Sequence, residues 1–433
     1  MPPMPSPPRA AIAPARRCAY VVLRRVFEDG AYADRALHGE AKQLDARDRA
    51  LAMRLVYGAV QRKCTLDYLI ERLADRHHER LDARLLAALR LGLYELLYLG
   101  GAPDHAVVAD GVELAKGGAR GGHGLVNAVL RRGAREGPAL LAQLSDDTPE
   151  QAAIKHSHPG WIARLWWEEL GASDARALMA YDNEPGEVAL RANTLLTDAA
   201  TLAGELPVAT HADSALPEAL VLEGPFDVHG SPAWGAGAFL AQSRAAMHVS
   251  QMLDPQPGER VLDLCAAPGG KSTHLAALMG GEGEVVAVER NARRAGMLTR
   301  TAQRLHVPNI RVEVADAEVK RPEGAVFDRV LVDPPCSGLG TLQARADLRW
   351  RVTEENVREM TPIQASILAA AAAAVRPGGV LVYSTCTISP TENELQIAAF
   401  LDAHPDFSRD DFMMTLPHRD HTAGFFIARL QRD

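Results

Sequence analysis

The sequence predicts an α/β protein that ends in a doubly wound parallel sheet, preceded by an all-α domain and a small α/β module. The chain has 433 residues, enough for two or three domains of ordinary size. Residues 15–137 place apolar side chains at helical spacing, and from about residue 235 short apolar runs alternate with helical stretches. We therefore expect a disordered Pro-rich lead over 1–14, an all-helical domain over 15–145, a connecting module over 146–234 and a sheet domain over 235–433.

The N-terminal third is expected to be helical after its first fourteen residues. Six prolines among those fourteen, without an apolar signal core, are typical of a disordered segment. Apolar residues then recur every three or four positions, as in RCAYVVLRRVF and ARLLAALRLGLYELLYL. Asp45 and Asp48 mark the start of one helix, because acidic side chains suit the positive end of the helix dipole.

The connecting region combines a helical pattern with short strand-like runs. The segment HSHPGWIARLWWEELG predicts an amphipathic helix, in which we interpret Trp161, Trp166 and Trp167 as packing residues. VALRANTL and EALVLEG then predict short strands. A small α/β module follows from this pattern.

The C-terminal part alternates strands with helices. The predicted strands are ERVLDLC, GEVVAVE, IRVEVA, FDRVLVD and GVLVYST, with GFFIARL as a last strand. Helical stretches such as KSTHLAALMG and TPIQASILAAAAAAV separate them. Ligands of such sheets bind at the carboxyl ends of the strands, so the residues that follow each strand are the candidate site residues.

The charge distribution limits which polyanions the protein can bind. Forty-seven basic and 55 acidic residues give a net charge of −8, which excludes a uniformly basic surface. Residues 1–150 nevertheless carry +3, against −11 for residues 151–433. Local phosphate contacts are therefore expected from the N-terminal part and from the stretch with Arg345, Arg349 and Arg351, where Trp350 is the candidate for base stacking.

Cysteine usage indicates a reducing compartment. Cys18, Cys64, Cys265, Cys336 and Cys386 are odd in number and widely spaced, with no CxxC pair. This pattern argues against a disulfide scaffold and a zinc ribbon, and it leads us to expect a cytoplasmic protein. No apolar run approaches the roughly 18 residues of a membrane span.

A glycine-containing turn follows the first predicted strand. It reads DLCAAPGGK over residues 263–271, and its glycines let the backbone approach a ligand at a helix N-terminus. The dinucleotide fingerprint GxGxxG is absent, and a phosphate-binding loop would require Gly where Cys265 stands. The turn therefore predicts a ligand other than a dinucleotide or a nucleoside triphosphate.

Three carboxylates follow the next three strands. Glu289 comes 19 residues after Gly270, where a carboxylate can accept hydrogen bonds from ribose hydroxyls. Asp316 and Asp333 end the following two strands, although either could serve equally well as a turn cap. The four features together resemble the S-adenosylmethionine pocket of Rossmann-like methyltransferases, which implies methyl transfer.

Two late cysteines suggest which atom receives the methyl group. Cys336 and Cys386 each follow a predicted strand of the sheet. Carbon 5 of cytosine is too poor a nucleophile to be methylated unaided, so a thiolate must first add to carbon 6, and a second acid/base group must assist the later elimination. Cys18 and Cys64, on apolar helix faces, are interpreted as packing residues.

The segments DLCAAPGGKS, AVER, VADA, DPPCSG and STCT resemble the motifs of two-cysteine RNA (cytosine-5) methyltransferases. A preceding helical domain similar to NusB makes the chain resemble the RsmB (Sun/Fmu) family of 16S ribosomal RNA methyltransferases. The resemblance implies that Cys386 is the nucleophile, that Cys336 assists product release and that Asp333 also lies near the target base. It assigns the cofactor S-adenosylmethionine to Cys265, Ala266, Ala267, Pro268, Gly269, Gly270, Lys271, Glu289, Asp316 and Asp333.

The same resemblance implies a substrate. It points to cytosine 967 of 16S ribosomal RNA, which we expect to be bound free or in a partly assembled small subunit. We also expect a monomeric enzyme without a metal, since methyl transfer needs none. The sequence departs from the family pattern at Ser243, Gln343, Ala344 and Ala423, and Glu289 replaces the more usual Asp. These departures concern RNA contact and target choice.

Other functions remain open at this stage. An amino-group methyltransferase also has Asp-Pro-Pro, but it carries an aromatic residue where Cys336 stands. A catalytically inert RNA-binding or antitermination factor is the second alternative, with Arg131, Arg132 and Arg135 either contacting phosphates or forming a solvated helix end. The histidines at 156, 158, 418 and 421 have plausible metal spacing but no accompanying cysteines.

Overall fold

The computed structural model describes residues 12–117, 121–321 and 326–433, and the chain forms two compact units. The helical unit comprises the chain up to Asn183 together with Arg345–Arg351. The sheet unit comprises Glu184–Ala344 and Val352–Asp433. The predicted disordered lead lies, as far as residue 11, outside the described residues, and the first helix begins at Pro14. The domain boundaries expected near residues 145 and 234 stay predictions.

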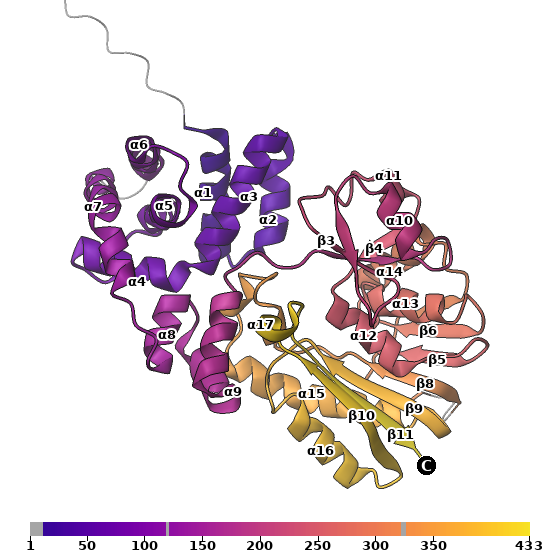
Figure 1. Ribbon diagram of the computed structural model, residues 1–433. Coiled ribbons are helices and arrows are strands. Elements are labelled where there is room, and N and C mark those ends of the chain that lie inside the picture. The colour runs from indigo at the N-terminus through magenta and orange to yellow at the C-terminus, as the bar shows by residue number, and fades with distance from the viewer. Residues whose placement is uncertain (1–11, 118–120, 322–325) are drawn as a thin grey trace, which may run out of the picture. The chain divides into compact units, whose positions relative to one another are not determined.

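The helical unit confirms the predicted all-α region (Figure 1). Its α-helices are α1 (Pro14–Glu28), α2 (Ala33–Glu40), α3 (Ala46–Gln61), α4 (Lys63–Ala74), α5 (Ala83–Tyr94), α6 (Asp104–Leu114), α7 (Gly122–Ala142), α8 (Pro149–His156) and α9 (Gly160–Tyr181). Short turns of other helix types are η1 (Ala41–Gln43), η2 (His78–Arg80), η3 (Glu95–Leu99), η4 (Ala115–Gly117) and η6 (Leu348–Trp350).

Local sequence signals explain several of these helix boundaries. Asp45 caps α3, since its carboxylate accepts a hydrogen bond of 2.8 Å from the Asp48 backbone N–H, as the acidic pair predicted. Helix α9 begins only at Gly160 and bends at Gly171, whose φ of +79° interrupts the helix. Trp166 is fully buried, in line with its interpretation as a packing residue.

The arginines after VNAVL lie inside α7 and not at a helix end, because the helix continues to Ala142. Arg132 pairs with Glu136 at 3.0 Å and with Asp75 at 3.2 Å, and Arg135 pairs with Glu136 at 2.6 Å. The interpretation of these arginines as a solvated helix end is therefore wrong, while a contact with phosphates stays a prediction.

The inserted segment 345–351 is held by buried hydrogen bonds within the helical unit. Arg349 is fully buried, and its guanidinium donates to the Ser157 carbonyl at 3.1 Å and to Asn183 Oδ1 at 3.0 Å. Trp350 donates from Nε1 to the Val60 carbonyl at 2.7 Å. The expectation that this stretch contacts phosphates is wrong for Arg349, and Trp350 is partly engaged in packing. The sequence alone does not distinguish an arginine that donates hydrogen bonds to several buried carbonyl groups from an arginine at the surface.

Replacing Arg349 with methionine is expected to destabilise the helical unit by about 3 kcal/mol, because several buried carbonyl groups lose their donor. Arg345, four residues earlier, is exposed, so Arg345→Met is the matched control. Thermal unfolding of both variants checks the prediction. Equal melting temperatures for the two variants would contradict the structural role of Arg349.

The sheet unit begins with a small antiparallel sheet of strand order β2-β3-β1-β4. Its elements are β1 (Ala189–Ala192), α10 (Ala199–Glu205), β2 (Thr210–Ala212), β3 (Ala219–Leu222), α11 (Pro232–Gly235) and β4 (Phe239–Ala241). Strands β1 and β3 confirm the runs VALRANTL and EALVLEG. The three-residue strands β2 and β4 were not predicted, because so short a segment carries no readable alternation.

The large sheet has seven strands in the order β10-β11-β9-β8-β5-β6-β7. They are β5 (Arg260–Asp263), β6 (Glu284–Val288), β7 (Ile310–Glu313), β8 (Phe327–Val332), β9 (Val375–Thr385), β10 (Phe407–Thr415) and β11 (Phe425–Arg432). Strands β5 to β9 are parallel, whereas β11 pairs antiparallel with both β9 and β10. The predicted doubly wound fold is confirmed, but its sheet is mixed and not purely parallel.

Helices cover both faces of the large sheet (Figure 1). Val249 of α12 (Arg244–Leu253) and Leu275 of α13 (Gly270–Leu278) pack against one face. Leu368 of α15 (Glu354–Ala372) and Phe400 of α16 (Glu394–Ala403) pack against the other. The remaining elements are α14 (Ala292–Arg304), η5 (Leu339–Thr341) and α17 (Pro417–Asp420). In the described ranges, no helix has the length and apolarity that crossing a membrane would require.

Candidate active site

The predicted ligand-binding turn connects β5 to α13 and lies against the end of β6. The backbone N–H groups of Cys265 and Ala266 donate to the Val288 carbonyl at 3.2 and 2.9 Å. Gly269 has a φ of +103°, and a Cβ there would lie 3.0 Å from Leu298 Cγ. A residue with a side chain would be strained at this position, which explains the glycine.

Two carboxylates flank the turn at the strand ends. Asp263 is buried, and its Oδ2 accepts from Ser272 Oγ at 2.6 Å, while its Oδ1 has no hydrogen-bond partner among the described residues. Burial raises the pKa of Asp263 to about 7. Glu289 is 4% exposed and accepts from the Asn291 backbone N–H at 2.8 Å. Both side chains lie beside the turn at the carboxyl edge of the sheet.

These residues fit S-adenosylmethionine. The buried Asp263 Oδ1 requires a donor, which the ammonium group of a methionine moiety can supply. Glu289 offers a carboxylate for ribose hydroxyls. Asp316 is exposed, and its Oδ1 accepts from the Glu318 N–H at 3.0 Å, so the structure shows a turn there and leaves its predicted contact with the cofactor as a prediction.

Arg191 supports the turn from strand β1, and sequence reasoning missed it. The guanidinium is buried and donates to the Gly270 carbonyl at 2.6 Å, to Gln242 Oε1 at 2.6 Å and to Thr273 Oγ1 at 2.9 Å. Burial lowers the pKa of Arg191 to about 9, so it is still charged at neutral pH. The signal that could have identified it is a lone arginine within the apolar run VALRANTL.

Arg191→Met is expected to weaken S-adenosylmethionine binding about tenfold, because the first turn of α13 loses two hydrogen bonds from the buried guanidinium. Isothermal calorimetry measures the change. Arg409 on β10 is exposed, so Arg409→Met is the control for the loss of one arginine. A folded Arg191→Met protein with unchanged affinity would show that Arg191 does not shape the cofactor turn.

The two late cysteines meet at the ends of neighbouring parallel strands. Cys386 directly follows β9, and Cys336 lies in the loop after β8. Their sulfur atoms are 3.4 Å apart. The hydrogen bond with Cys386, followed by burial and nearby negative charges, raises the pKa of Cys336 well above that of an ordinary thiol. Cys336 is therefore a thiol at neutral pH.

A partly buried ion pair lies beside the cysteines. Lys271 Nζ donates to Asp333 Oδ2 at 2.6 Å, and Ser384 Oγ donates to Asp333 Oδ1 at 3.3 Å. Burial opposes the charge on Lys271, but the Asp333 carboxylate outweighs it, and the interaction with Cys386 adds to the rise in the pKa of Lys271. Lys271 is thus a fixed cation next to Cys386, and a cation favours the thiolate form of a cysteine.

Buried polar residues hold the two cysteine loops, and sequence reasoning did not identify them. Glu392 accepts from the Ser337 N–H at 2.8 Å and from Gln364 Nε2 at 3.0 Å. Asn393 contacts Thr385 and Thr387, the two neighbours of Cys386. In the sequence, the segment TENE, which contains Glu392 and Asn393, indicates only the start of a helix.

Cys18 and Cys64 belong to the helical unit and not to these strand ends. Cys18 is buried in the helical unit, and burial raises the pKa of the Cys64 thiol to about 11. Both observations agree with their interpretation as packing residues. Within the described parts of the chain, no group of three or more His, Cys, Asp and Glu side chains is placed to hold a metal ion.

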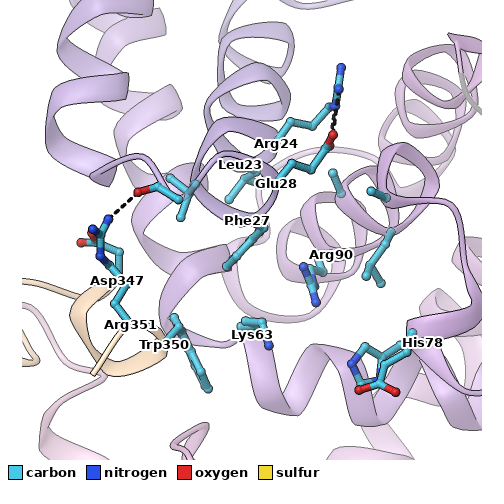
Figure 2. Close-up of a pocket in the computed structure, with 16 residues that line it drawn as sticks. Leu23, Arg24, Phe27, Glu28, Lys63, His78, Arg90, Asp347, Trp350 and Arg351 are labelled. Atoms are coloured by element: carbon cyan, nitrogen blue, oxygen red, sulfur yellow. Dashed lines mark hydrogen bonds and ion pairs between the residues drawn. The ribbon is translucent and has the colours of Figure 1, made fainter. Parts of the chain in front are cut away.

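The helical unit contains a cavity of about 460 Å³ (Figure 2). Phe27, Lys63, Arg90 and Trp350 are among its lining residues, with Lys63 Nζ 4.9 Å from the centroid of the Trp350 ring. Arg90 is bound by the buried Asp67 through two hydrogen bonds. None of the predicted catalytic or cofactor residues lines this cavity.

Comparison with known proteins extends these observations over the whole chain. Residues 250–431 match the family described as 16S rRNA methyltransferase RsmB/F, residues 13–135 the NusB family, and residues 158–229 the ferredoxin-like domain of RsmF/B-like methyltransferases. The chain is 39% identical to the probable ribosomal RNA small subunit methyltransferase B of Synechocystis, over 96% of this chain and 99% of that protein. The corresponding Bacillus subtilis protein is 33% identical, over 96% and 98%.

A solved structure shows the same fold over nearly the full length. The crystal structure of PH0851 superposes with a TM-score of 0.83 at 28% identity, covering 98% of this chain and all of that chain. The relatives, the Rossmann-like sheet and the cofactor turn agree with one another. The protein is accordingly a methyltransferase that uses S-adenosylmethionine, and it belongs to the ribosomal RNA small subunit methyltransferase B family.

Proposed function

We propose that the protein methylates carbon 5 of a cytosine in 16S ribosomal RNA through a covalent bond between Cys386 and the base, with Cys336 assisting product release. The observation that carries this proposal is the pair of thiols, whose sulfur atoms lie 3.4 Å apart at two neighbouring strand ends. An amino-group methyltransferase has no use for two adjacent thiols. Methylation at an activated ring carbon requires a nucleophile and a second acid/base group.

The reaction proceeds by addition and elimination. The Cys386 thiolate adds to carbon 6, and the displaced electron pair makes carbon 5 nucleophilic. S-adenosylmethionine supplies the electrophilic methyl group, which carbon 5 takes up. A base then removes the carbon 5 proton, and the carbon–sulfur bond breaks as the Cys336 thiol gives its proton to the departing sulfur of Cys386. Solvent then returns a proton to Cys336. The Cys336 sulfur, 3.4 Å from that of Cys386, is within reach of the departing thiolate.

The electrostatics support different roles for the two cysteines. Lys271 interacts favourably with a Cys386 thiolate, which suits the nucleophile. Cys336 faces the carboxylates of Asp333 and Glu392, and its pKa is raised. A thiol that keeps its proton suits an acid that assists elimination.

The names of the relatives indicate the substrate class. Both full-length relatives are named as small-subunit ribosomal RNA methyltransferases, and this chain covers nearly their whole length. We propose 16S ribosomal RNA, with cytosine 967 as the target, either free or in a partly assembled subunit. The proposal includes a monomeric enzyme in the cytoplasm, consistent with five free cysteines in the described residues.

The proposal is tested with purified protein, S-adenosylmethionine and unmodified 16S RNA, followed by bisulfite sequencing. Protection of one cytosine from conversion, dependent on the cofactor, is the expected result. Cofactor binding without any protected cytosine, on both free RNA and assembly intermediates, would contradict it. An inert RNA-binding factor would in addition fail to bind S-adenosylmethionine in calorimetry.

A further inference from the structure

We propose that Glu392 and Asn393 are a pair of positioning residues that hold Cys336 and Cys386 at their short separation, each residue fixing one cysteine loop. This inference rests on the proposed function of the two cysteines, and it adds the two residues that position them. Glu392 and Asn393 are fully buried, directly before α16. Their side chains hydrogen-bond to Gln364 and to residues of the two cysteine loops.

Glu392 fixes the loop that carries Cys336. Its Oε1 accepts from the Ser337 N–H at 2.8 Å, and its Oε2 accepts from the hydroxyl of the same serine. Gln364 Nε2 donates to Oε1 at 3.0 Å and also to the Pro335 carbonyl at 2.9 Å. The residues on both sides of Cys336 are therefore tied, directly or through Gln364, to one carboxylate.

Asn393 fixes the loop that carries Cys386. Its Oδ1 accepts from Thr385 Oγ1 at 2.5 Å, and its Nδ2 donates to the Thr387 carbonyl at 3.0 Å. These partners are the residues immediately before and after Cys386. One amide side chain thus binds the residues on both sides of Cys386.

A hydroxyl pair connects the two halves. Ser337 Oγ and Thr387 Oγ1 are 2.6 Å apart. Because Ser337 uses its only hydroxyl proton toward Glu392, Thr387 must donate to Ser337. The resulting chain runs from Thr387 through Ser337 to Glu392, and it links the residues that follow the two cysteines.

Glu392 also contributes to the charge around Cys336. Cys336 faces Cys386 and the carboxylates of Asp333 and Glu392, with the phenol of Tyr383 close by. Lys271 supplies the cation that interacts with Cys386. Loss of the Glu392 charge removes one of the negative charges that oppose ionisation of Cys336, whereas the amide of Asn393 contributes geometry and no charge.

The test measures the alkylation of each cysteine by iodoacetamide at pH 8 without RNA, read by peptide mass spectrometry. In Glu392→Gln we expect alkylation of Cys336 to rise about threefold or more, since a lower pKa exposes more thiolate. In Asn393→Leu, which removes both hydrogen bonds without adding a charge, alkylation is expected to rise most at Cys386, because the loop that carries it is no longer fixed. The kcat for methylation should fall about tenfold or more in both variants, with the KM for S-adenosylmethionine changed less than about threefold.

Controls separate this role from a general loss of structure. Glu394→Gln changes an exposed carboxylate two residues away and is expected to alter neither alkylation nor kcat. Ser337→Ala breaks the hydroxyl link while leaving Glu392 charged, so it provides the test if Glu392→Gln does not fold, and its kcat should fall in the same way. Unchanged alkylation and unchanged kcat in the folded variants would overturn the proposal.

The alkylation pattern is independent of the substrate. If the unsubstituted protein fails to methylate cytosine but the variants shift alkylation as described, the proposed function fails and the positioning pair stands. If the unsubstituted protein methylates cytosine and the variants behave like Glu394→Gln, only the positioning pair is wrong.

Discussion

Cys386→Ala is expected to lower the rate of RNA methylation by at least about a thousandfold while changing S-adenosylmethionine affinity less than about threefold. Without the Cys386 thiol, the group proposed to add to carbon 6 is lost, and carbon 5 stays unreactive. Cys386 follows β9, and the cofactor turn follows β5, with β8 between these two strands in the sheet. A tritium-transfer assay measures the rate, and calorimetry measures the affinity.

Cys18→Ala is the matched control for this variant. Cys18 is buried in the helical unit, so the substitution removes one thiol without touching the site. It is expected to retain full activity below its melting temperature. Methylation by Cys386→Ala at more than about a tenth of the normal rate would contradict the assignment of the nucleophile.

Cys336→Ala is expected to accumulate a covalent complex between the protein and its RNA. Addition through Cys386 and methyl transfer remain possible, but the group proposed to assist release is lost. Denaturing electrophoresis with labelled RNA should show a shifted band that depends on S-adenosylmethionine, while turnover falls at least about a hundredfold. Full turnover without a shifted band would contradict the proposed role of Cys336.

The double variant Cys336→Ala, Cys386→Ala tests which residue forms the covalent bond with the RNA. Because the covalent bond is assigned to Cys386, the double variant should show no shifted band. A band that persists would mean that another residue attacks the base. The two single variants and the double variant together assign each sulfur atom to one step.

The sequence predicted the architecture well where the pattern is long and regular. Helical spacing identified the helical region, and apolar runs identified β5, β6, β7, β8, β9 and β11. Strand β10 was missed because its middle residues are exposed and polar, as expected at the edge of a sheet. The antiparallel direction of β11 depends on its connection through β10, which no local pattern encodes.

The candidate site was predictable to the extent that its residues follow strands. Cys336, Cys386 and Asp333 were predicted as site residues because each follows a predicted strand. The structure places them together with Lys271. Arg191 and Glu392 were missed because buried polar residues owe their role to distant partners, here Gly270 and Ser337. Arg349 was misread for the same reason, since its partners lie more than 160 residues away in sequence.

The most direct test of the central claim uses RNA in which the target cytosine carries fluorine at carbon 5. Methyl transfer can then occur, but the elimination that should follow is blocked, because carbon 5 carries fluorine in place of the proton that must leave. The proposal predicts a stable complex in which peptide mass spectrometry finds the methylated fluorocytosine on Cys386. A complex mapped to Cys336, or no complex under conditions that methylate the unmodified RNA, would contradict the covalent mechanism proposed for this enzyme.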